Sequence, residues 1–237
     1  MPVLSVTFPM FDLLVKGGIV MIPLLLLSVL TIATSLERLW FWYRLLSKED
    51  RIVRDVIDAA PQSLVEARTI AERASTLAIG RFLLAPLRLR QPSPETFRLA
   101  MESAADKEFV RMRRGDKFLE TVVALSPLLG LLGTVTGLIR TFNNLDIGGQ
   151  GSGESGELAA AGIGEALITT AAGMFVAILA LVFFRIFVTL QSRQVDYFSE
   201  VGTELELIYR QQWYESNGHS EGHGEAVRLP AESPSSV

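Results

Sequence analysis

Three long runs of apolar residues separate the polar parts of this chain. The first is Gly17–Leu36, and runs of 19 consecutive uncharged residues follow at Thr121–Ile139 and Ala166–Phe184. A helix needs about 20 predominantly apolar residues to cross the hydrocarbon core of a bilayer. The hydropathy pattern therefore predicts an all-α integral membrane protein with three transmembrane helices.

The first run fits two descriptions, a transmembrane helix or a cleaved signal peptide. It is long for the apolar region of a signal peptide, and no Ala-x-Ala cleavage site follows it. It ends in Glu37-Arg38, followed by an aromatic cluster over residues 40–43 and by Arg44. Aromatic residues followed by positive charge are typical of a membrane surface, which favours a span.

The polar region between the first two spans has the period of amphipathic helices. Asp50–Ala59 and Ser63–Leu84 show this period, with Pro61 between them. Ser93 and Pro94 have the pattern of a helix start, with Ser93 as the N-cap. Apolar residues then recur every three or four positions, at Phe97, Met101, Ala105, Phe109 and Met112. We expect this helix to run without interruption into the second span.

The two ends of the chain are less regular. After Arg185 an amphipathic pattern continues to about Trp213, with Phe198, Val201 and Leu205 among its apolar positions. From Glu215 onward the sequence is rich in Ser, Gly, Glu and Pro and lacks a pattern for burial, so we expect it to be disordered. Residues 1–16 form either a small interfacial helix or a partly ordered N-terminus.

The distribution of charge predicts the orientation. Arg44–Lys117 holds 15 of the 22 Lys and Arg residues, whereas Asn143–Glu157 holds none. Positive loops stay in the cytoplasm, so the first segment is predicted to be cytoplasmic, the second external, the N-terminus external and the C-terminus cytoplasmic.

The predicted segments are an N-terminal segment 1–16, transmembrane helix 1 at 17–43, a cytoplasmic helical domain 44–117, transmembrane helix 2 at 118–142, an external loop 143–157, transmembrane helix 3 at 158–190, a cytoplasmic helix 191–213 and a tail 214–237.

Composition excludes several classes of function. There is no Cys, so neither a disulfide nor a thiolate metal site is available, and the net charge of −4 gives no support for nucleic-acid binding. His219 and His223 are four residues apart, but no further ligand lies near them, so we predict no metal site and no cofactor. The spans also lack a paired nucleophile and base, so we predict no enzyme.

The last two spans each place small and polar residues on one helical face. Such residues usually face another helix or a water-filled cavity. We interpret the glycines as packing positions: Gly130, Gly133, Gly137 and Gly173. We interpret the polar residues as candidates for lining a pore: Ser126, Thr134, Thr141, Glu165, Thr169 and Thr170. Glu165 is the one ionisable residue within Leu158–Phe183, and the alternative for it is an ordinary interfacial carboxylate.

Two segments within these spans resemble a known family. Residues 128–137 read LLGLLGTVTG and residues 162–173 read GIGEALITTAAG. Both are similar to the signature segments of the ExbB/TolQ/MotA proton channel family. Three spans, a large loop after the first, and Glu37-Arg38-Leu39 at the end of that span resemble ExbB and TolQ more than the four-span MotA. The resemblance covers most of residues 10–210.

The resemblance implies an assembly and a mechanism. It implies a homo-pentamer in the bacterial inner membrane, whose second and third helices line a central pore around an ExbD/TolR-like dimer of single-span partners. A carboxylate of the partner would carry protons, and the complex would use proton-motive force to do mechanical work on a TonB- or TolA-like protein across the periplasm. The family's two pore threonines match Thr134 and Thr170, and its glutamate matches Glu165.

The sequence also departs from the family pattern, which leaves the subtype open. Ala161, Leu179 and Arg185 stand where the family often has Pro, Pro and Asn. The leading hypothesis is a proton-channel subunit of an ExbB–ExbD-like motor, as in TonB-dependent transport. The alternatives are a TolQ-like subunit for envelope maintenance, a motility stator subunit, and a membrane scaffold that anchors a partner helix without conducting.

Overall fold

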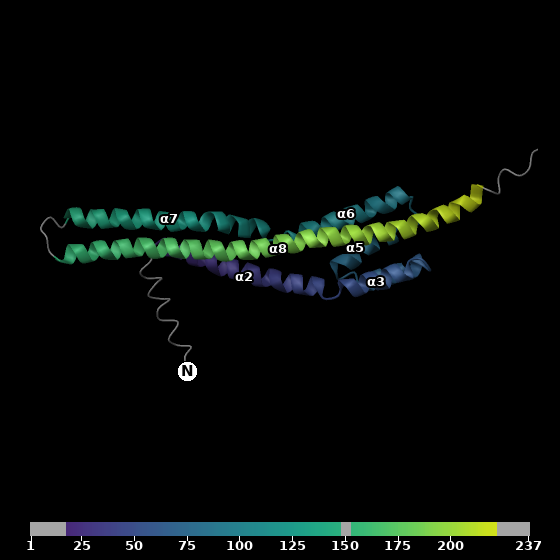
Figure 1. Cartoon of the computed structure of the whole chain (residues 1–237), viewed down its shortest axis with the longest axis horizontal. Coiled ribbons are helices and arrows are strands. Elements are labelled where there is room, and N and C mark those ends of the chain that lie inside the picture. The colour runs from purple at the N-terminus through teal and green to yellow at the C-terminus, as the bar shows by residue number, and fades with distance from the viewer. Residues whose placement is uncertain (1–17, 148–152, 222–237) are drawn as a thin grey trace, which may run out of the picture. The chain divides into compact units, whose positions relative to one another are not determined.

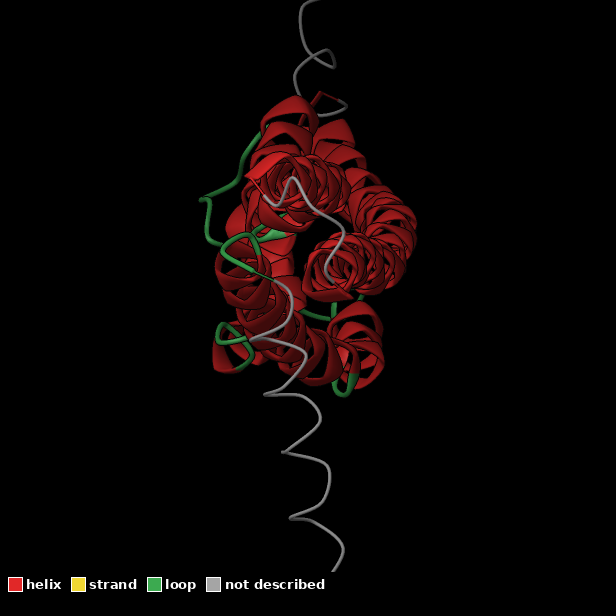
Figure 2. Ribbon diagram, turned by 90° about the vertical axis from the view of Figure 1, so that its left-hand side faces the viewer, coloured by secondary structure: helices red, strands yellow, loops and turns green. Residues whose placement is uncertain are grey.

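The structure, a computed structural model, describes residues 18–147 and 153–221, and every regular element in these ranges is a helix (Figures 1 and 2). The helices are α2 (Met21–Leu46), α3 (Glu49–Ala59), α4 (Leu64–Arg73), α5 (Ala78–Leu87), α6 (Pro94–Met112), α7 (Asp116–Ile147) and α8 (Gly153–Glu221). They form two compact units. We call Met1–Trp42 with Arg113–Ser192 the span unit, and Tyr43–Met112 with Arg193–Val237 the polar unit.

Among the described residues, three long helices are apolar enough to cross a membrane, and their apolar parts lie in α2, α7 and α8. This agrees with the three runs in the sequence. Pro23 is the third residue of α2, where its missing N–H group has no partner to lose. Large apolar side chains remain exposed on every span, including Leu26 on α2, Leu128 on α7 and Phe175 on α8. Lipid or another protein must cover surfaces of this kind.

The core of the span unit joins its three helices. Val122 of α7 packs with Val176 and Ala180 of α8, and Leu27 of α2 packs against this cluster. Thr31 of α2 is fully buried, and its hydroxyl group donates to the Leu27 carbonyl oxygen at 2.7 Å. A threonine can therefore lie in this core because its own helix satisfies its hydroxyl group.

The polar unit has a conventional aromatic core. The face of α6 that the sequence predicted is confirmed, since Phe97, Met101 and Met112 are buried. The ring of Phe97 stacks on that of Tyr209 from α8 with 4.0 Å between centroids. Ser93 caps α6 as predicted, accepting a hydrogen bond from the Thr96 N–H group at 3.2 Å.

An ion pair inside the polar unit was not predicted. The Glu108 side chain on α6 is only 5% exposed and accepts two hydrogen bonds from Arg81 on α5, at 2.8 and 2.6 Å. Arg111 donates to the same carboxylate at 2.8 Å. The bidentate geometry fixes α5 against α6, because a buried carboxylate requires partners.

The helix expected to continue from Glu95 into the second span is interrupted, so that prediction was wrong. α6 ends at Met112, a turn follows over residues 113–115, and α7 begins at Asp116. Gly115 has φ +91°, a left-handed conformation that glycine adopts without strain. A glycine in this conformation commonly ends a helix, and an acidic residue is favourable in the first turn of the next helix. The apolar residues that recur every three or four positions had obscured this helix break in the sequence.

Other boundaries also differ from the prediction. Ser63–Leu84 is two helices rather than one, because residues 74–77 form a turn between α4 and α5. α7 continues to Ile147 and α8 starts at Gly153, so the connection is shorter than the predicted loop 143–157. α8 also continues past Trp213 to Glu221. The expectations for residues 1–16 and for the distal tail lie outside the described residues, apart from this extension.

Candidate functional site

The second and third spans approach each other closely through glycine. A Cβ atom added at Gly133 would lie 2.3 Å from Cγ2 of Thr169, and one added at Gly173 would lie 2.6 Å from the Ser126 carbonyl oxygen. At Gly137 the nearest atom would be Cβ of Ala166, at 3.0 Å. α7 therefore packs on α8 of the same chain, and side chains at these glycines would push the two helices apart.

The two adjacent threonines of α8 meet this interface in different ways. Thr169 is fully buried, and its hydroxyl group donates to the Glu165 carbonyl oxygen of its own helix at 2.7 Å. The half-buried Thr170 donates instead across the interface, to the Gly130 carbonyl oxygen of α7 at 2.9 Å. Gly130 lacks a side chain that would block this approach. The Thr170 bond is thus a direct polar link between the two spans.

The polar residues of α7 bond mostly within their own helix. Thr134 is half-buried, and its hydroxyl group donates to the Leu131 carbonyl oxygen at 2.6 Å. Thr141 is buried against Gly162 and donates to the Gly137 carbonyl oxygen at 3.0 Å. Ser126 is fully buried as well. The structure thus places Ser126, Thr141 and Thr170 at or in the α7–α8 interface, while Thr134 lies partly exposed on α7.

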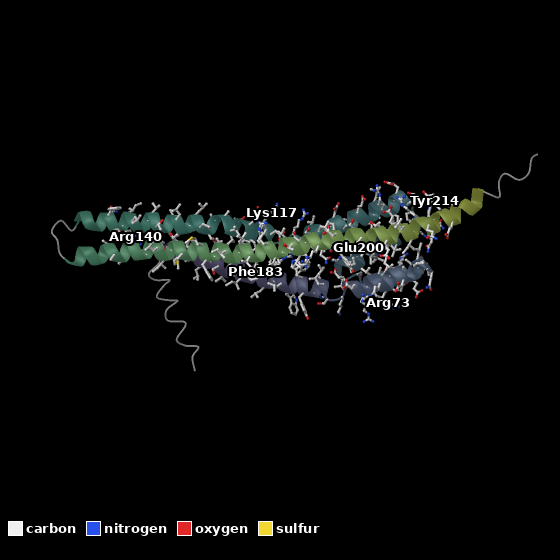
Figure 3. The ribbon with its side chains drawn as sticks, in the orientation of Figure 1. Arg73, Lys117, Arg140, Phe183, Glu200 and Tyr214 are labelled. Atoms are coloured by element: carbon white, nitrogen blue, oxygen red, sulfur yellow. The ribbon has the colours of Figure 1, made fainter. Side chains whose placement is uncertain are left out.

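Glu165 has a basic partner that the sequence reasoning missed. Arg140 of α7 donates from Nη1 to Oε1 of Glu165 at 2.9 Å. The Glu165 side chain is 21% exposed and that of Arg140 is 52% exposed. Arg140 lies toward the end of α7 at which the chain turns back into α8 (Figure 3). The signal was present in the sequence, because Arg140 ends the uncharged run of the second span just as Glu165 precedes that of the third.

A second polar cluster joins α2, α7 and α8 at the other end of the packed spans. Arg38 of α2 is buried, lies over the Phe41 ring at 4.5 Å and has Asp116 of α7 as a charged neighbour. Gln191 of α8 donates to Oδ2 of Asp116 at 2.6 Å. The spans are therefore tied by polar contacts near both ends of their packed segment.

These features define an all-α, multi-pass membrane protein whose last two spans pack through glycines and carry hydroxyl groups and one carboxylate. The chain belongs to the MotA/TolQ/ExbB proton channel family, whose model matches residues 74–200. This is a family of channel proteins rather than of enzymes.

Named relatives agree with this membership. The chain is 70% identical over 212 residues to the ExbB-like 1 protein of Synechocystis sp., covering 90% of this chain and 84% of that protein. It is 33% identical over 189 residues to the biopolymer transport protein ExbB of Salmonella typhimurium, covering 74% and 73%. It is also 33% identical over 133 residues to the Tol-Pal system protein TolQ of Haemophilus influenzae, covering 52% and 57%.

Proposed function

We propose that this protein is the proton-channel subunit of an ExbB–ExbD-like motor in the inner membrane. The motor would couple proton-motive force to mechanical energy transfer across the envelope, as in TonB-dependent transport. The observation that carries the proposal is the α7–α8 pair, in which Thr134, Thr170 and Glu165 bring polar groups into spans of a proton-channel family. The longer match to ExbB than to TolQ favours the ExbB type.

The proposed assembly is a homo-pentamer around a central pore that holds a dimer of single-span, ExbD/TolR-like partners. Exposed apolar side chains on α7 support it, because Leu128, Leu131 and Val135 are 61%, 58% and 48% exposed in the single chain. Neighbouring subunits, the partner and lipid would share these surfaces. In this arrangement the charged polar unit is cytoplasmic and the connection between α7 and α8 is periplasmic.

The threonines would act as hydrogen-bond acceptors for the moving proton. The hydroxyl hydrogens of Thr134 and Thr170 are already donated to carbonyl oxygens, and each hydroxyl oxygen keeps lone pairs free to accept. Such an oxygen can accept from water or from a protonated carboxyl group of the partner, but it offers no hydrogen to a carboxylate. The site would therefore favour the protonated partner, without any titration of the threonines.

Proton flux measured in liposomes tests this proposal. The purified subunit and its single-span partner would be reconstituted together and flux followed with an interior pH dye. We expect Thr134→Val and Thr170→Val to keep the shape of the side chain and the oligomer, yet to abolish partner-dependent flux. Thr136→Val is the matched control, since Thr136 also bonds within α7 but is not among the candidate pathway residues. Wild-type flux in both valine variants would show that the threonines serve packing alone.

The same measurement separates the channel from the scaffold. A scaffold that only anchors the partner would form the complex, and no variant would change flux because wild type would conduct nothing.

Native mass spectrometry of the detergent-solubilised complex tests the assembly independently, with five copies expected per complex. A stable monomer would contradict the proposed pore, whatever the flux result.

A further inference from the structure

A buried carboxyl group in the polar unit lies outside the proposed proton pathway. Glu49 is the first residue of α3, a helix with six charged residues among eleven that follows the apolar part of α2. Its exposure is 5%, unlike the exposed acidic residues Asp50, Asp55 and Asp58 of the same helix. The partner of Glu49 is Gln194 of α8, which is 3% exposed. The Gln194 amide donates from Nε2 to Oε1 of Glu49 at 2.6 Å.

Each of these two groups has one further buried atom that makes no hydrogen bond within the part of the chain that the structure describes. These atoms are Oε2 of Glu49 and Oε1 of Gln194. Both are acceptors when the carboxyl group is ionised, so neither can satisfy the other, and a buried acceptor without a hydrogen bond destabilises the folded state. A single proton on Glu49 changes this, because Oε2–H becomes a donor and the Gln194 carbonyl oxygen is an acceptor.

We propose that Glu49 and Gln194 form a proton-binding site, in which the protonated carboxyl group and the amide make two mutual hydrogen bonds. The Gln194 N–H group donates to Oε1 of Glu49, as observed, and the Glu49 O–H group donates to Oε1 of Gln194. The ligand is one proton taken from the surrounding water, and no other group changes its charge. Protonation would therefore tighten the packing of α3 on α8.

The electrostatic surroundings agree with this assignment. Burial raises the pKa of Glu49 to about 7, against an opposing effect of the hydrogen bond from Gln194, and the nearby carboxylate of Asp50 raises it further. From α8, the Tyr197 hydroxyl group faces the same region and donates to Oδ1 of Asp50 at 3.0 Å. Burial raises the pKa of the Tyr197 hydroxyl group, as do the carboxylates of Asp50 and Glu49, whereas the positive charge of Arg54 on α3 lowers this pKa. The site would thus respond within the pH range of a cell.

The sign of the pH effect follows from proton linkage. The folded state holds a proton up to about pH 7, whereas an ordinary glutamate in the unfolded chain releases it near pH 4.5. Stability from this pair is therefore fully present below pH 4.5 and is lost as the pH rises to about 7. Within that window, each unit of pH lowers the folding constant by up to about tenfold for one proton.

Thermal unfolding of the full-length protein in detergent, measured from pH 4.5 to pH 8.5, tests the proposal. We expect the wild-type midpoint to fall with rising pH up to about pH 7 and then to level off. Glu49→Gln, an amide that cannot titrate, should remove this fall. The exchanged variant Glu49→Gln/Gln194→Glu should restore it, because the acid–amide pair is rebuilt in the opposite sense. Asp58→Asn is the control, since Asp58 is an exposed carboxylate of the same helix.

Infrared difference spectra between pH 6 and pH 8.5 give a second measurement that does not depend on unfolding. We expect a protonated carboxyl band at pH 6 in wild type and in Asp58→Asn, and its loss in Glu49→Gln. The proposal is overturned if wild type and Glu49→Gln have the same pH profile of stability, or if the band is present in both. These results are independent of proton flux, so they stand apart from the proposed channel function.

Discussion

At the scale of single residues, the hydroxyl groups of the two candidate pore threonines differ in the helix to which they donate a hydrogen bond. Thr170 bonds across the interface to Gly130, whereas Thr134 bonds to Leu131 of its own helix. We predict that Thr170→Val lowers the free energy of unfolding by about 0.6 kcal/mol and by at most about 1.7 kcal/mol, the average and the maximum found for hydrogen bonds between helices in a membrane protein. Thr134→Val should change it by less. Unfolding in a denaturing detergent measures both, and equal losses would show that the Thr170 bond contributes nothing specific.

The ion pair between Arg140 and Glu165 predicts a coupling between the two side chains. Because Arg140 is half exposed, we expect a modest interaction of about 0.5–1 kcal/mol. Arg140→Gln and Glu165→Gln should each destabilise the protein, and the double variant should lose less than the sum. The double-mutant cycle is measured by the same unfolding assay, with Arg185→Gln as a control for the loss of an exposed charge on α8. Additive losses would mean that the two groups do not interact.

Residue types could be predicted from the sequence, but their partners could not. The register of Glu165, Thr169 and Thr170 follows from one helical period, so their common face was visible in the sequence. The contact of Glu165 with Arg140 joins residues 25 apart, and that of Glu108 with Arg81 joins residues 27 apart. Such pairs depend on how two helices lie against each other, which local pattern does not specify.

At the scale of helices, the glycines predict a sharp difference between two otherwise similar substitutions. Gly133→Ala places a Cβ atom 2.3 Å from Cγ2 of Thr169, so α7 and α8 must separate. Gly164→Ala on α8 meets nothing within 4 Å, and alanine favours a helix by about 1 kcal/mol over glycine in water. We expect Gly133→Ala to lower the thermal midpoint in detergent and Gly164→Ala to leave it equal or higher. A larger loss for Gly164→Ala would contradict the observed packing.

The sequence predicts that glycines pack helices here, and in the structure Gly133 and Gly173 lie where α7 meets α8. The Gly133-x-x-x-Gly137 spacing indicates a close approach but names no partner, so a neighbouring subunit and the same chain were equally compatible with it. The helix start at Ser93 was predictable because a cap is a local hydrogen bond. The break at Gly115 was missed because apolar residues on both sides keep a helical period.

At the scale of the whole chain, α8 contributes to both units as one helix of 69 residues. Its first part supplies Val176 and Ala180 to the span unit, and its second part supplies Phe198 and Leu205 to the polar unit. The hydropathy pattern predicted this change from an apolar span to an amphipathic helix. It could not set the end of the helix, because the residues beyond Trp213 carry no burial pattern.

The orientation of the chain gives a prediction that needs no background correction, because the protein has no native cysteine. Thr76 and Ser216 are exposed residues of the polar unit, and Asn143 is an exposed residue near the far end of α7. The unit that contains Thr76 also holds most of the basic residues, which predicts a cytoplasmic position. Single cysteines at Thr76 and Ser216 should therefore be protected from a membrane-impermeant thiol reagent in cells with a permeabilised outer membrane. A cysteine at Asn143 should react. Labelling all three after lysis is the control for accessibility, and the reverse pattern before lysis would overturn the proposed orientation.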